Sequence, residues 1–365
     1  MRVLFVGSPG GNPTDGGAST FQNTLLAGLN RMEKSQAHDF FYIQPNPKTH
    51  VIHQCTLDNQ IDFVWFMSPY YEEVEVPFAA TVWDLGHREV PYFPEVSVSG
   101  WKFDHREGFY RYLLPRAAIV VIGNSVGAAQ IHQFYQVPLE NICCIPMPFN
   151  AQAFSGVPKN ASLLEPLGLT PGEYLFYPAQ FWPHKNHITL VDTLQILRSC
   201  GKDLKLVFCG SDKGNLSYVK EYVARNNLQD VVVFAGFVET SVLHQLYLNA
   251  FAMVFASLLG PDNIPPLEAM ALGCPVVCAN YAGARVQLEE SALYFDGLDA
   301  HEAAAKVLRL YDVGERNRLL KHSASLIKAR SEDEYFRKVG DALNRFARIR
   351  RLWGPCNSFK RDLGY

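Results

Sequence analysis

One stretch of the chain, Gly260 to Val277, combines residues that could bind an anion with a single carboxylate beside them. An apolar run at 251–256 precedes it, and a second apolar run begins at Pro275. This pattern predicts a loop and a short helix between two buried parallel strands. In such a unit the N-terminus of the helix lies at the carboxyl edge of the sheet. Its unpaired N–H groups there attract anions.

The residues at the start of this helix suit that chemistry. Pro265 and Pro266 fit the first turn, where a missing N–H costs nothing, and the helix is expected over 267–272. Glu268, just inside the helix, is poorly placed for phosphate and well placed for vicinal hydroxyls such as those of a ribose. Three backbone amides before the helix are expected to be free for a ligand: those of Asp262, Asn263 and Ile264.

From Pro265 through Val276 the sequence resembles the signature of retaining glycosyltransferases of family four, which have the GT-B fold. The family signature begins Glu-Gly-Phe-Gly-Leu-Pro, and its second Glu, matched here by Glu268, binds the nucleotide ribose. Its first Glu touches the donor sugar, and Gly260 stands in that place. Asp262 and Asn263 replace the Phe-Gly pair, so we expect these two residues and nearby amides to contact the sugar and take part in catalysis.

A second loop, 177–187, directly follows an expected strand and contains Lys185. The carboxyl edge of a parallel sheet is where such folds bind ligands. In the resembled family a Lys here and an Arg five residues earlier grip the diphosphate; Gln180 holds the Arg position. A fixed cation stabilises the negative charge that develops when the sugar–phosphate bond breaks. Three further residues could supply a second cation: His184, His187 and Arg285.

The resemblance implies further donor contacts elsewhere in the chain. Gly16 and Gly17, in a glycine-rich turn after the first expected strand, match a Gly pair that cradles the donor near the diphosphate, although a structural turn is the alternative. The base is expected to be held by backbone groups near Phe237 and Val238. The other expected donor contacts are Leu243 and Tyr247 at the ribose, with Ile264, Pro265 and Leu267 in the signature.

Asp84 follows an expected strand in the first half of the chain. The family often has His-Asp here, with the His touching the donor sugar, whereas Trp83 precedes Asp84 and His87 comes later. Asp84 could orient a ring nitrogen or accept a proton from the acceptor. The alternative is that Trp83 packs in the core and Asp84 caps a turn.

Two successive series of alternating strands and helices must position these residues. Each series predicts a doubly wound parallel sheet, so the fold class is α/β with two Rossmann-like domains. The expected boundaries are an acceptor-side domain at 1–155, a nucleotide-sugar domain at 170–330 and a linker near 151–172. The GT-B resemblance implies that the domains face each other across a cleft. It also implies that the C-terminal helix and tail, 331–365, return to the first domain.

The C-terminal helix has a clear start, with Ser331 as N-cap and acidic residues at 332–334. Its end carries four arginines beside Trp353: Arg345, Arg348, Arg350 and Arg351. One interpretation is a solvated helix end. The other is contact with an anionic membrane surface that holds a lipid-linked acceptor.

Composition excludes several classes of function. A net charge of −3 gives no general attraction to nucleic acid. The hydrophobic fraction of 48% is that of a soluble globular protein, and no apolar run approaches the roughly 20 residues of a membrane span. The eight cysteines form no CxxC pair and predict free thiols. The expected localisation is the cytoplasm, with peripheral contact at the inner face of the membrane as an extension.

These inferences predict a retaining hexosyltransferase that acts in polysaccharide or glycan synthesis. The expected donor is UDP-glucose, then GDP-mannose, and the acceptor is a carbohydrate or a lipid-linked saccharide. No DxD motif or ligand cluster is present, so neither a metal nor a cofactor besides the donor is expected. Two alternatives stay open. One is a nucleotide-sugar-binding protein that has lost catalysis, suggested by Gly260, Gln180 and Trp83; the other is a sugar-nucleotide epimerase of the same fold.

Overall fold

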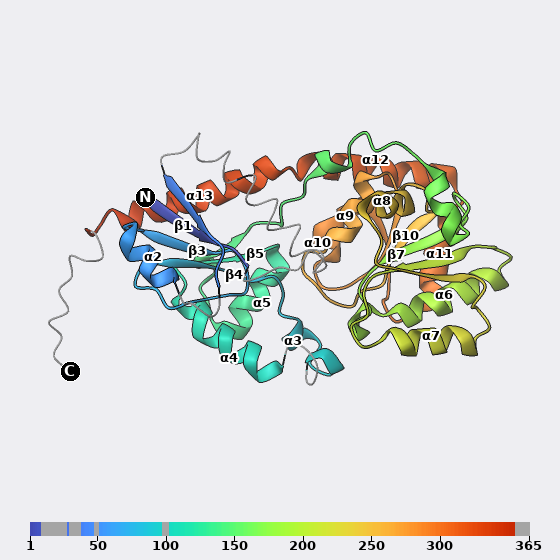
Figure 1. Cartoon of the computed structure of the whole chain (residues 1–365), viewed down its shortest axis with the longest axis horizontal. Helices are drawn as coiled ribbons and strands as arrows, with labels where there is room; N and C mark the ends of the chain where they lie inside the picture. The colour runs from blue at the N-terminus through green and yellow to red at the C-terminus, as the bar shows by residue number, and fades with distance from the viewer. Residues whose placement is uncertain (9–27, 29–37, 47–50, 97–101, 355–365) are drawn as a thin grey trace. The chain divides into compact units, whose positions relative to one another are not determined.

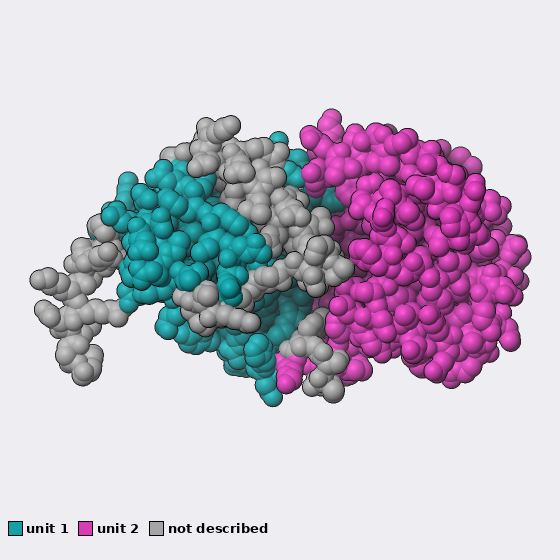
Figure 2. Space-filling view, viewed as in Figure 1, with its two compact units in different colours: residues 1–85, 104–149, 331–365 teal, residues 86–103, 150–330 magenta. Residues whose placement is uncertain are grey.

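The computed structural model describes residues 1–8, 28, 38–46, 51–96 and 102–354 of the 365-residue chain. These residues divide into two compact units, coloured separately in Figure 2. Unit 1 comprises 1–85, 104–149 and 331–365, and unit 2 comprises 86–103 and 150–330. Each unit has its own parallel sheet, and the two are described in turn.

Unit 1 contains a six-stranded parallel sheet in the order β2-β1-β3-β4-β5-β6. The strands are β1 (Arg2–Val6), β2 (Asp39–Ile43), β3 (Phe63–Phe66), β4 (Phe78–Thr81), β5 (Ile119–Ile122) and β6 (Ile142–Cys144). The central strands β3, β4 and β5 are buried at every residue. Helices that cover both faces explain why these strands are continuous apolar runs without alternation.

One face of this sheet packs against α2 (Ile52–Asp58), α4 (Phe103–Leu113) and α5 (Ser125–Tyr135). The other face is covered by the C-terminal helix α13 (Glu332–Arg350), which runs alongside β1 and β3 in Figure 1. The rings of Phe63 and Phe346 lie 4.8 Å apart in this layer. At its start, the Ser331 hydroxyl accepts from the Glu334 N–H at 3.2 Å, which confirms the predicted N-cap.

Unit 2 contains a second six-stranded parallel sheet, in the order β12-β11-β10-β7-β8-β9. The strands are β7 (Tyr174–Pro178), β8 (Lys205–Cys209), β9 (Val232–Gly236), β10 (Ala252–Phe255), β11 (Val276–Ala279) and β12 (Ala292–Phe295). Counted in chain order from β7, this is the 3-2-1-4-5-6 arrangement of dinucleotide-binding folds. The order reverses between β7 and β10, which pair directly with Phe176 opposite Met253.

Helices lie on both faces of the second sheet (Figure 1). They are α6 (His187–Ser199), α7 (Leu216–Arg225), α8 (Thr240–Leu248), α9 (Ile264–Ala271), α10 (Ala284–Leu288), α11 (Ala300–Arg309) and α12 (Val313–Ala329). None of the helices in the described ranges is both long enough and apolar enough to cross a bilayer.

The structure of two segments differs from what the sequence predicted. Residues 86–103, which include the short helix α3 (Gly86–Glu89), group with unit 2 although the residues on both sides belong to unit 1. The expected linker is not bare chain, because it contains the 3-10 turns η4 (Ala151–Phe154) and η5 (Ala161–Leu167). It is tied to unit 2 by a 2.7 Å bond from the Asn160 N–H to the Gln245 side chain.

Candidate functional site

The reversal point of the second sheet brings two loops to the same edge. One loop leaves β7 and leads to Lys185; the other leaves β10 and leads to α9. In open parallel sheets the chains on either side of such a point diverge and leave a crevice at the carboxyl ends of the strands. The sequence placed its main candidate residues on these two loops, and the topology brings the loops together.

Lys185 ends a three-residue 3-10 turn, η6 (Pro183–Lys185). Its Nζ donates to the hydroxyl of Ser257 at 3.2 Å and lies 5.8 Å from the ring centre of Phe255. Its carbonyl accepts from the hydroxyl of Tyr177 at 2.8 Å. These contacts fix Lys185, a partly exposed residue, at the carboxyl edge of the second sheet.

Asn186 and Ser257 support this loop, and sequence reasoning missed both. Asn186 has a left-handed backbone conformation, and its side chain donates to the Gly297 carbonyl at 2.6 Å. Thr189 in turn donates to Asn186 Oδ1 at 2.8 Å. Asn tolerates the left-handed region better than most residues. The sequence signal for this supporting role was therefore an Asn placed directly between the loop and the following helix α6.

α9 has the predicted prolines in its first turn and Asn263 as N-cap, but it runs from Ile264 to Ala271 and so begins three residues before the expected Leu267. The expectation of a free Asn263 amide is wrong. The Asn263 N–H donates to Gln287 Oε1 at 3.0 Å, and the Asn263 carbonyl accepts from Gln287 Nε2 at 2.6 Å. Gln287 is completely buried in α10, and Tyr281 donates to the same Oε1 at 3.0 Å. A buried side-chain amide thus satisfies the backbone that a ligand was expected to meet.

Asp262 is held inside unit 2. Its Oδ1 lies 3.3 Å from Nη1 of Arg330, and its side chain is 2% exposed. Arg330 also donates to the Gln287 carbonyl at 3.0 Å. The Asp262 carboxylate therefore faces a fixed cation and is almost completely buried. Its predicted contact with a sugar stays a prediction.

Gly260 occupies a backbone position that favours glycine. Its φ is +118°, and a Cβ built there would lie 2.7 Å from Nδ2 of Asn263. That same Nδ2 donates to the Gly260 carbonyl at 3.1 Å. The Asn263 side chain therefore fills the space in which a larger residue at 260 would begin, and a Glu does not fit this loop as it stands.

Glu268 is held by one buried tyrosine. The hydroxyl of Tyr247 donates to Glu268 Oε2 at 2.7 Å, and Tyr247 itself is fully buried. Burial raises the pKa of Glu268, although the bond from Tyr247 opposes that shift. Glu268 as a residue is partly exposed, and its carboxylate has a fixed orientation, as a group that accepts hydrogen bonds from ribose hydroxyls requires.

The remaining donor candidates are spread over the same edge. Phe237 follows β9 and is 69% exposed, whereas Val238 and Leu243 are partly buried. Ile264 and Pro265 are partly buried at the start of α9, but Leu267 is fully buried, so its side chain belongs to the core. Two further candidates, Gly16 and Gly17, lie outside the described residues.

The candidates for a second cation differ in their suitability. Burial lowers the pKa of His187 to about 3, so this residue is neutral. Arg285 donates to Asn280 at 3.0 Å and lies over the ring of Tyr294. Gln180, in place of an Arg, accepts from the indole of Trp182 at 3.1 Å. His184 is bonded to a buried carboxylate, Glu95, at 2.6 Å.

Asp84 follows β4 in unit 1, where Arg106 from α4 lies against it. Arg106 Nη2 is 3.0 Å from Asp84 Oδ1 and 3.3 Å from the Asp84 carbonyl. The ion pair is mostly buried, with the two side chains 17% and 24% exposed. Although burial opposes it, the nearby Asp84 charge raises the pKa of Arg106 above its ordinary value, so the guanidinium stays charged. The ion pair fixes the orientation of the Asp84 carboxylate. Its two predicted roles, orienting a ring nitrogen or accepting the acceptor proton, stay predictions.

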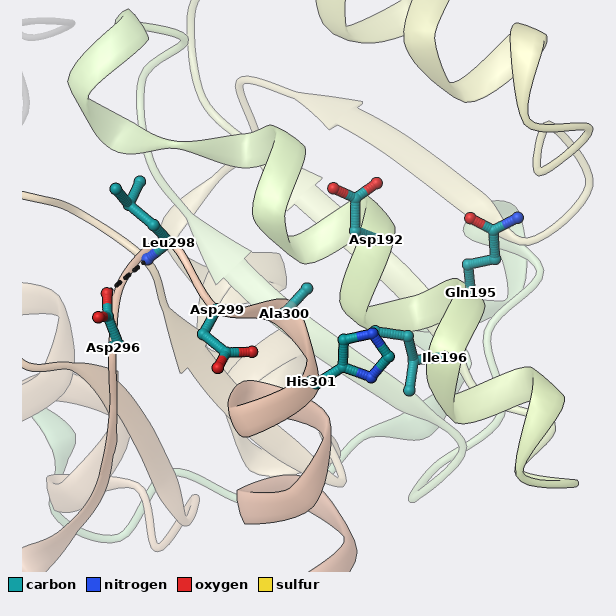
Figure 3. A pocket seen from close by; sticks show the side chains of 8 residues that line it. All are labelled: Asp192, Gln195, Ile196, Asp296, Leu298, Asp299, Ala300 and His301. Atoms are coloured by element: carbon teal, nitrogen blue, oxygen red, sulfur yellow. Dashed lines mark hydrogen bonds between the residues drawn. The ribbon is translucent and has the colours of Figure 1, made fainter.

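An open groove of about 620 Å³ lies elsewhere on unit 2, between α6 and the start of α11 (Figure 3). Three aspartates are among its lining residues: Asp192, Asp296 and Asp299. Each already accepts a hydrogen bond, from Tyr222, the Leu298 N–H and the Glu302 N–H respectively. An acidic lining repels a diphosphate. This groove is therefore not a candidate donor site.

Residues 165–326 match the family model of glycosyl transferases group 1. Unit 2 therefore contains a glycosyl transferases group 1 domain. O-antigen chain mannosyltransferase B of Escherichia coli is 22% identical over 231 residues, which cover 61% of each chain. O-antigen chain mannosyltransferase RfbU of Salmonella typhimurium is 32% identical over 113 residues, 31% of each chain. The chain thus aligns with less than two thirds of the length of these curated relatives.

Solved glycosyltransferase structures extend the similarity of fold to nearly the whole chain. Anabaena HepE, in complex with UDP and glucose, has a TM-score of 0.72 at 16% identity and covers 94% of this chain and 100% of its own. Sucrose-phosphate synthase from Thermosynechococcus elongatus has a TM-score of 0.69 at 16% identity, covering 96% and 99%. These similarities confirm the predicted fold class, that of GT-B glycosyltransferases.

Proposed function

We propose that this chain is a retaining glycosyltransferase that moves a hexose from a nucleoside diphosphate sugar to a saccharide acceptor. The observation that supports it best is the position of Lys185 in the loop after β7 and of Glu268 in α9, the helix after β10, at one reversal point. A fixed ammonium there suits a diphosphate, and a fixed carboxylate suits a ribose. The group 1 domain supplies the class of reaction.

The chemistry follows from these two groups. The bond between the anomeric carbon and the diphosphate breaks, and the electron pair goes to the leaving phosphate oxygen. Lys185 stabilises that charge more in the transition state than in the ground state, which is what accelerates a reaction. The acceptor oxygen bonds to the anomeric carbon on the face that the diphosphate leaves. The acceptor proton passes to the departing phosphate.

The proposed reaction uses no metal ion. In the part of the chain that the structure describes, no group of three or more His, Cys, Asp or Glu side chains is arranged to hold one. Lys185 performs the charge stabilisation that a divalent cation performs in other transferases. EDTA should leave turnover unchanged; loss of turnover that magnesium or manganese restores would contradict this part of the proposal.

The proposed donor sugar is a hexose, with mannose as the first candidate and glucose as the second. Two O-antigen mannosyltransferases and a mannosylfructose-phosphate synthase are among the sequence relatives. UDP-glucose, the donor expected from the sequence, stays the second candidate, and a structure of HepE holds that compound. The two donors, GDP-mannose and UDP-glucose, are therefore the first to test.

A lipid-linked saccharide at a membrane surface is the proposed acceptor. Two of the four arginines near the end of α13 make internal contacts: Arg350 with Asp62 at 2.6 Å and Arg345 with Cys143 at 3.1 Å. Arg348 and Arg351 are exposed, beside Leu352, which is 75% exposed. Co-sedimentation with vesicles containing anionic lipid tests this contact; equal binding to neutral vesicles would contradict it.

The alternative of a binding protein without catalysis is favoured by one observation. The loop at 260–263 uses its polar groups internally and does not present them to a sugar. Incubation with GDP-mannose and UDP-glucose, with oligosaccharide acceptors or by slow hydrolysis, separates the alternatives. Release of nucleoside diphosphate with an α-linked product supports the proposal. Binding without release supports the inactive protein, and an altered free sugar nucleotide supports an epimerase.

A further inference from the structure

A buried carboxylate from a distant part of the sequence lies against the turn that carries Lys185. Glu95, in the segment that follows α3, is 1% exposed, and His184 is 3% exposed. Glu95 Oε1 accepts from the His184 N–H at 3.0 Å and from His184 Nδ1 at 2.6 Å. The ring of Phe93, from the same segment, meets the His184 ring edge-on at 6.4 Å.

His184 is fixed from both sides. Its N–H and ring bind Glu95, and its carbonyl accepts from the Leu258 N–H at 3.0 Å. Leu258 lies in the loop after β10, next to the Ser257 that binds the Lys185 ammonium. His184 therefore joins the segment of Glu95 to the two loops of the reversal point.

The turn needs such support. η6 has three residues, and a 3-10 turn of this length is too short to hold its own conformation. Its geometry is set by the groups that bond to it. Because His184 directly precedes Lys185, any shift of His184 moves the Lys185 backbone and the reach of its ammonium.

Burial of Glu95 is costly, which argues for a function beyond stability. Burial alone raises the pKa of Glu95, but the bonds from His184 outweigh it and lower the pKa below its ordinary value, so Glu95 is ionised at neutral pH. Its second oxygen, Oε2, is buried and has no hydrogen-bond partner among the described residues. A half-satisfied buried carboxylate stabilises a fold poorly compared with an apolar residue.

We propose that Glu95 and His184 are positioning residues for Lys185, which makes the segment 86–96 part of the donor site of unit 2. This inference rests on the proposed function. The charge of Glu95 also rules out His184 as a second cation for the diphosphate, because an ionised Glu95 leaves the pair with no net positive charge in either protonation state of the histidine.

A double-mutant cycle tests the inference. Glu95→Ala should lower kcat by about 10–100-fold, since a displacement of about 1 Å at a reacting group can cost 10² in rate. In the Lys185→Ala background the same change should cause no further loss. Glu95→Gln, which keeps an acceptor oxygen, should retain much more activity than Glu95→Ala. Glu221→Ala, on the exposed face of α7, is the matched control and should behave as wild type.

Each variant is assayed at a temperature at which its measured unfolding shows it fully folded. A purely structural Glu95 would lower kcat by the same factor in both backgrounds, and this result would overturn the inference. Glu95→Ala with the wild-type rate would also overturn it. If Glu95→Ala does not fold, the cycle is run with His184→Ala, which removes the ring contact to Glu95 and should likewise cause no further loss in the Lys185→Ala background.

The affinity for GDP and UDP, measured by calorimetry, completes the cycle without turnover. The coupling between positions 95 and 185 should appear there too. A wild-type chain that neither releases nor binds these nucleotides would contradict the proposed function itself. A wild-type chain that is active and sensitive to Lys185→Ala, but insensitive to Glu95→Ala, would contradict only the positioning role.

Discussion

Each of the two units has a six-stranded parallel sheet, but the two sheets have different strand orders. In unit 2 the order reverses between β7 and β10, and the chain segments after these two strands carry the candidate residues Lys185 and Glu268. In unit 1 the order reverses between β1 and β3, whereas Asp84 follows β4, the next strand along. The reversal point, where parallel sheets bind ligands, therefore coincides with the described candidate residues only in unit 2.

The contacts of Lys185 and Asp84 also differ. The Lys185 ammonium donates to a neutral hydroxyl, while the Asp84 carboxylate faces the guanidinium of Arg106. A carboxylate in an ion pair with a guanidinium loses most of its field at a ligand. We therefore expect Asp84 to act mainly on stability, whereas Lys185, which the proposed function places at the diphosphate, should act on rate.

Lys185→Ala gives the largest expected effect. Loss of one preorganised group at a developing charge typically costs about 10²–10³ in kcat, and this loss should be much larger than the change in the unfolding free energy. Steady-state kinetics at saturating donor, with chemical denaturation alongside, measures both. Lys185→Arg should keep partial activity, because Arg retains the charge in a broader fork.

The matched control for this substitution is Lys321→Ala, on the exposed side of α12. It should leave kcat unchanged. Wild-type turnover by Lys185→Ala would remove the η6 loop from the diphosphate site and, with it, the contrast between the units.

Glu268→Ala should weaken binding of the nucleoside diphosphate by about 1.5–3 kcal/mol, the range for hydrogen bonds to a charged group. Calorimetry is the measurement, and unchanged affinity in a folded variant would exclude Glu268 from the ribose site. Because burial raises the pKa of Glu268, the carboxylate takes up its proton at a higher pH than an exposed glutamate. Wild-type affinity should therefore begin to fall, as pH is lowered, above the ordinary glutamate pKa, and Glu268→Gln should lack this pH dependence.

Gly260→Ala should lower the unfolding free energy by about 1–3 kcal/mol, since a non-glycine residue at this φ is strained and meets the Asn263 side chain. Chemical denaturation measures the change. Adding Asn263→Gly should recover the steric part of the loss. Full stability in Gly260→Ala would show that the loop adapts freely and that its glycine is not required by its shape.

Asp84→Asn gives the smallest expected change in nucleotide binding. It should leave the Kd for GDP and UDP within about twofold and lower stability by about 1 kcal/mol, as for a partly exposed ion pair. A tenfold loss of nucleotide affinity would place Asp84 in the donor site and end the distinction between the two sheet edges.

The sequence was sufficient wherever a residue's place depends on its neighbours in the chain. β5 and α5 begin and end where the apolar pattern predicted, and Lys185 and Glu268 lie on the predicted edge. The sequence did not predict contacts made by side chains that are distant in the chain. The Gln287 side chain, 24 residues along the chain, accepts a hydrogen bond from the Asn263 N–H. Glu95 is hydrogen-bonded to His184, which is 89 residues away in the sequence. No local pattern records such partners, because they are chosen by packing.

Hydrogen–deuterium exchange with and without GDP or UDP tests the central claim most directly, because it reports where on the chain the nucleotide binds. The account predicts slower exchange of backbone amides at 181–187 and 257–268, the two loops of the reversal point in unit 2. It also predicts no change at the acidic groove of α6 and α11. Protection confined to that groove or to the β4 edge of unit 1, with the two loops unchanged, would contradict it.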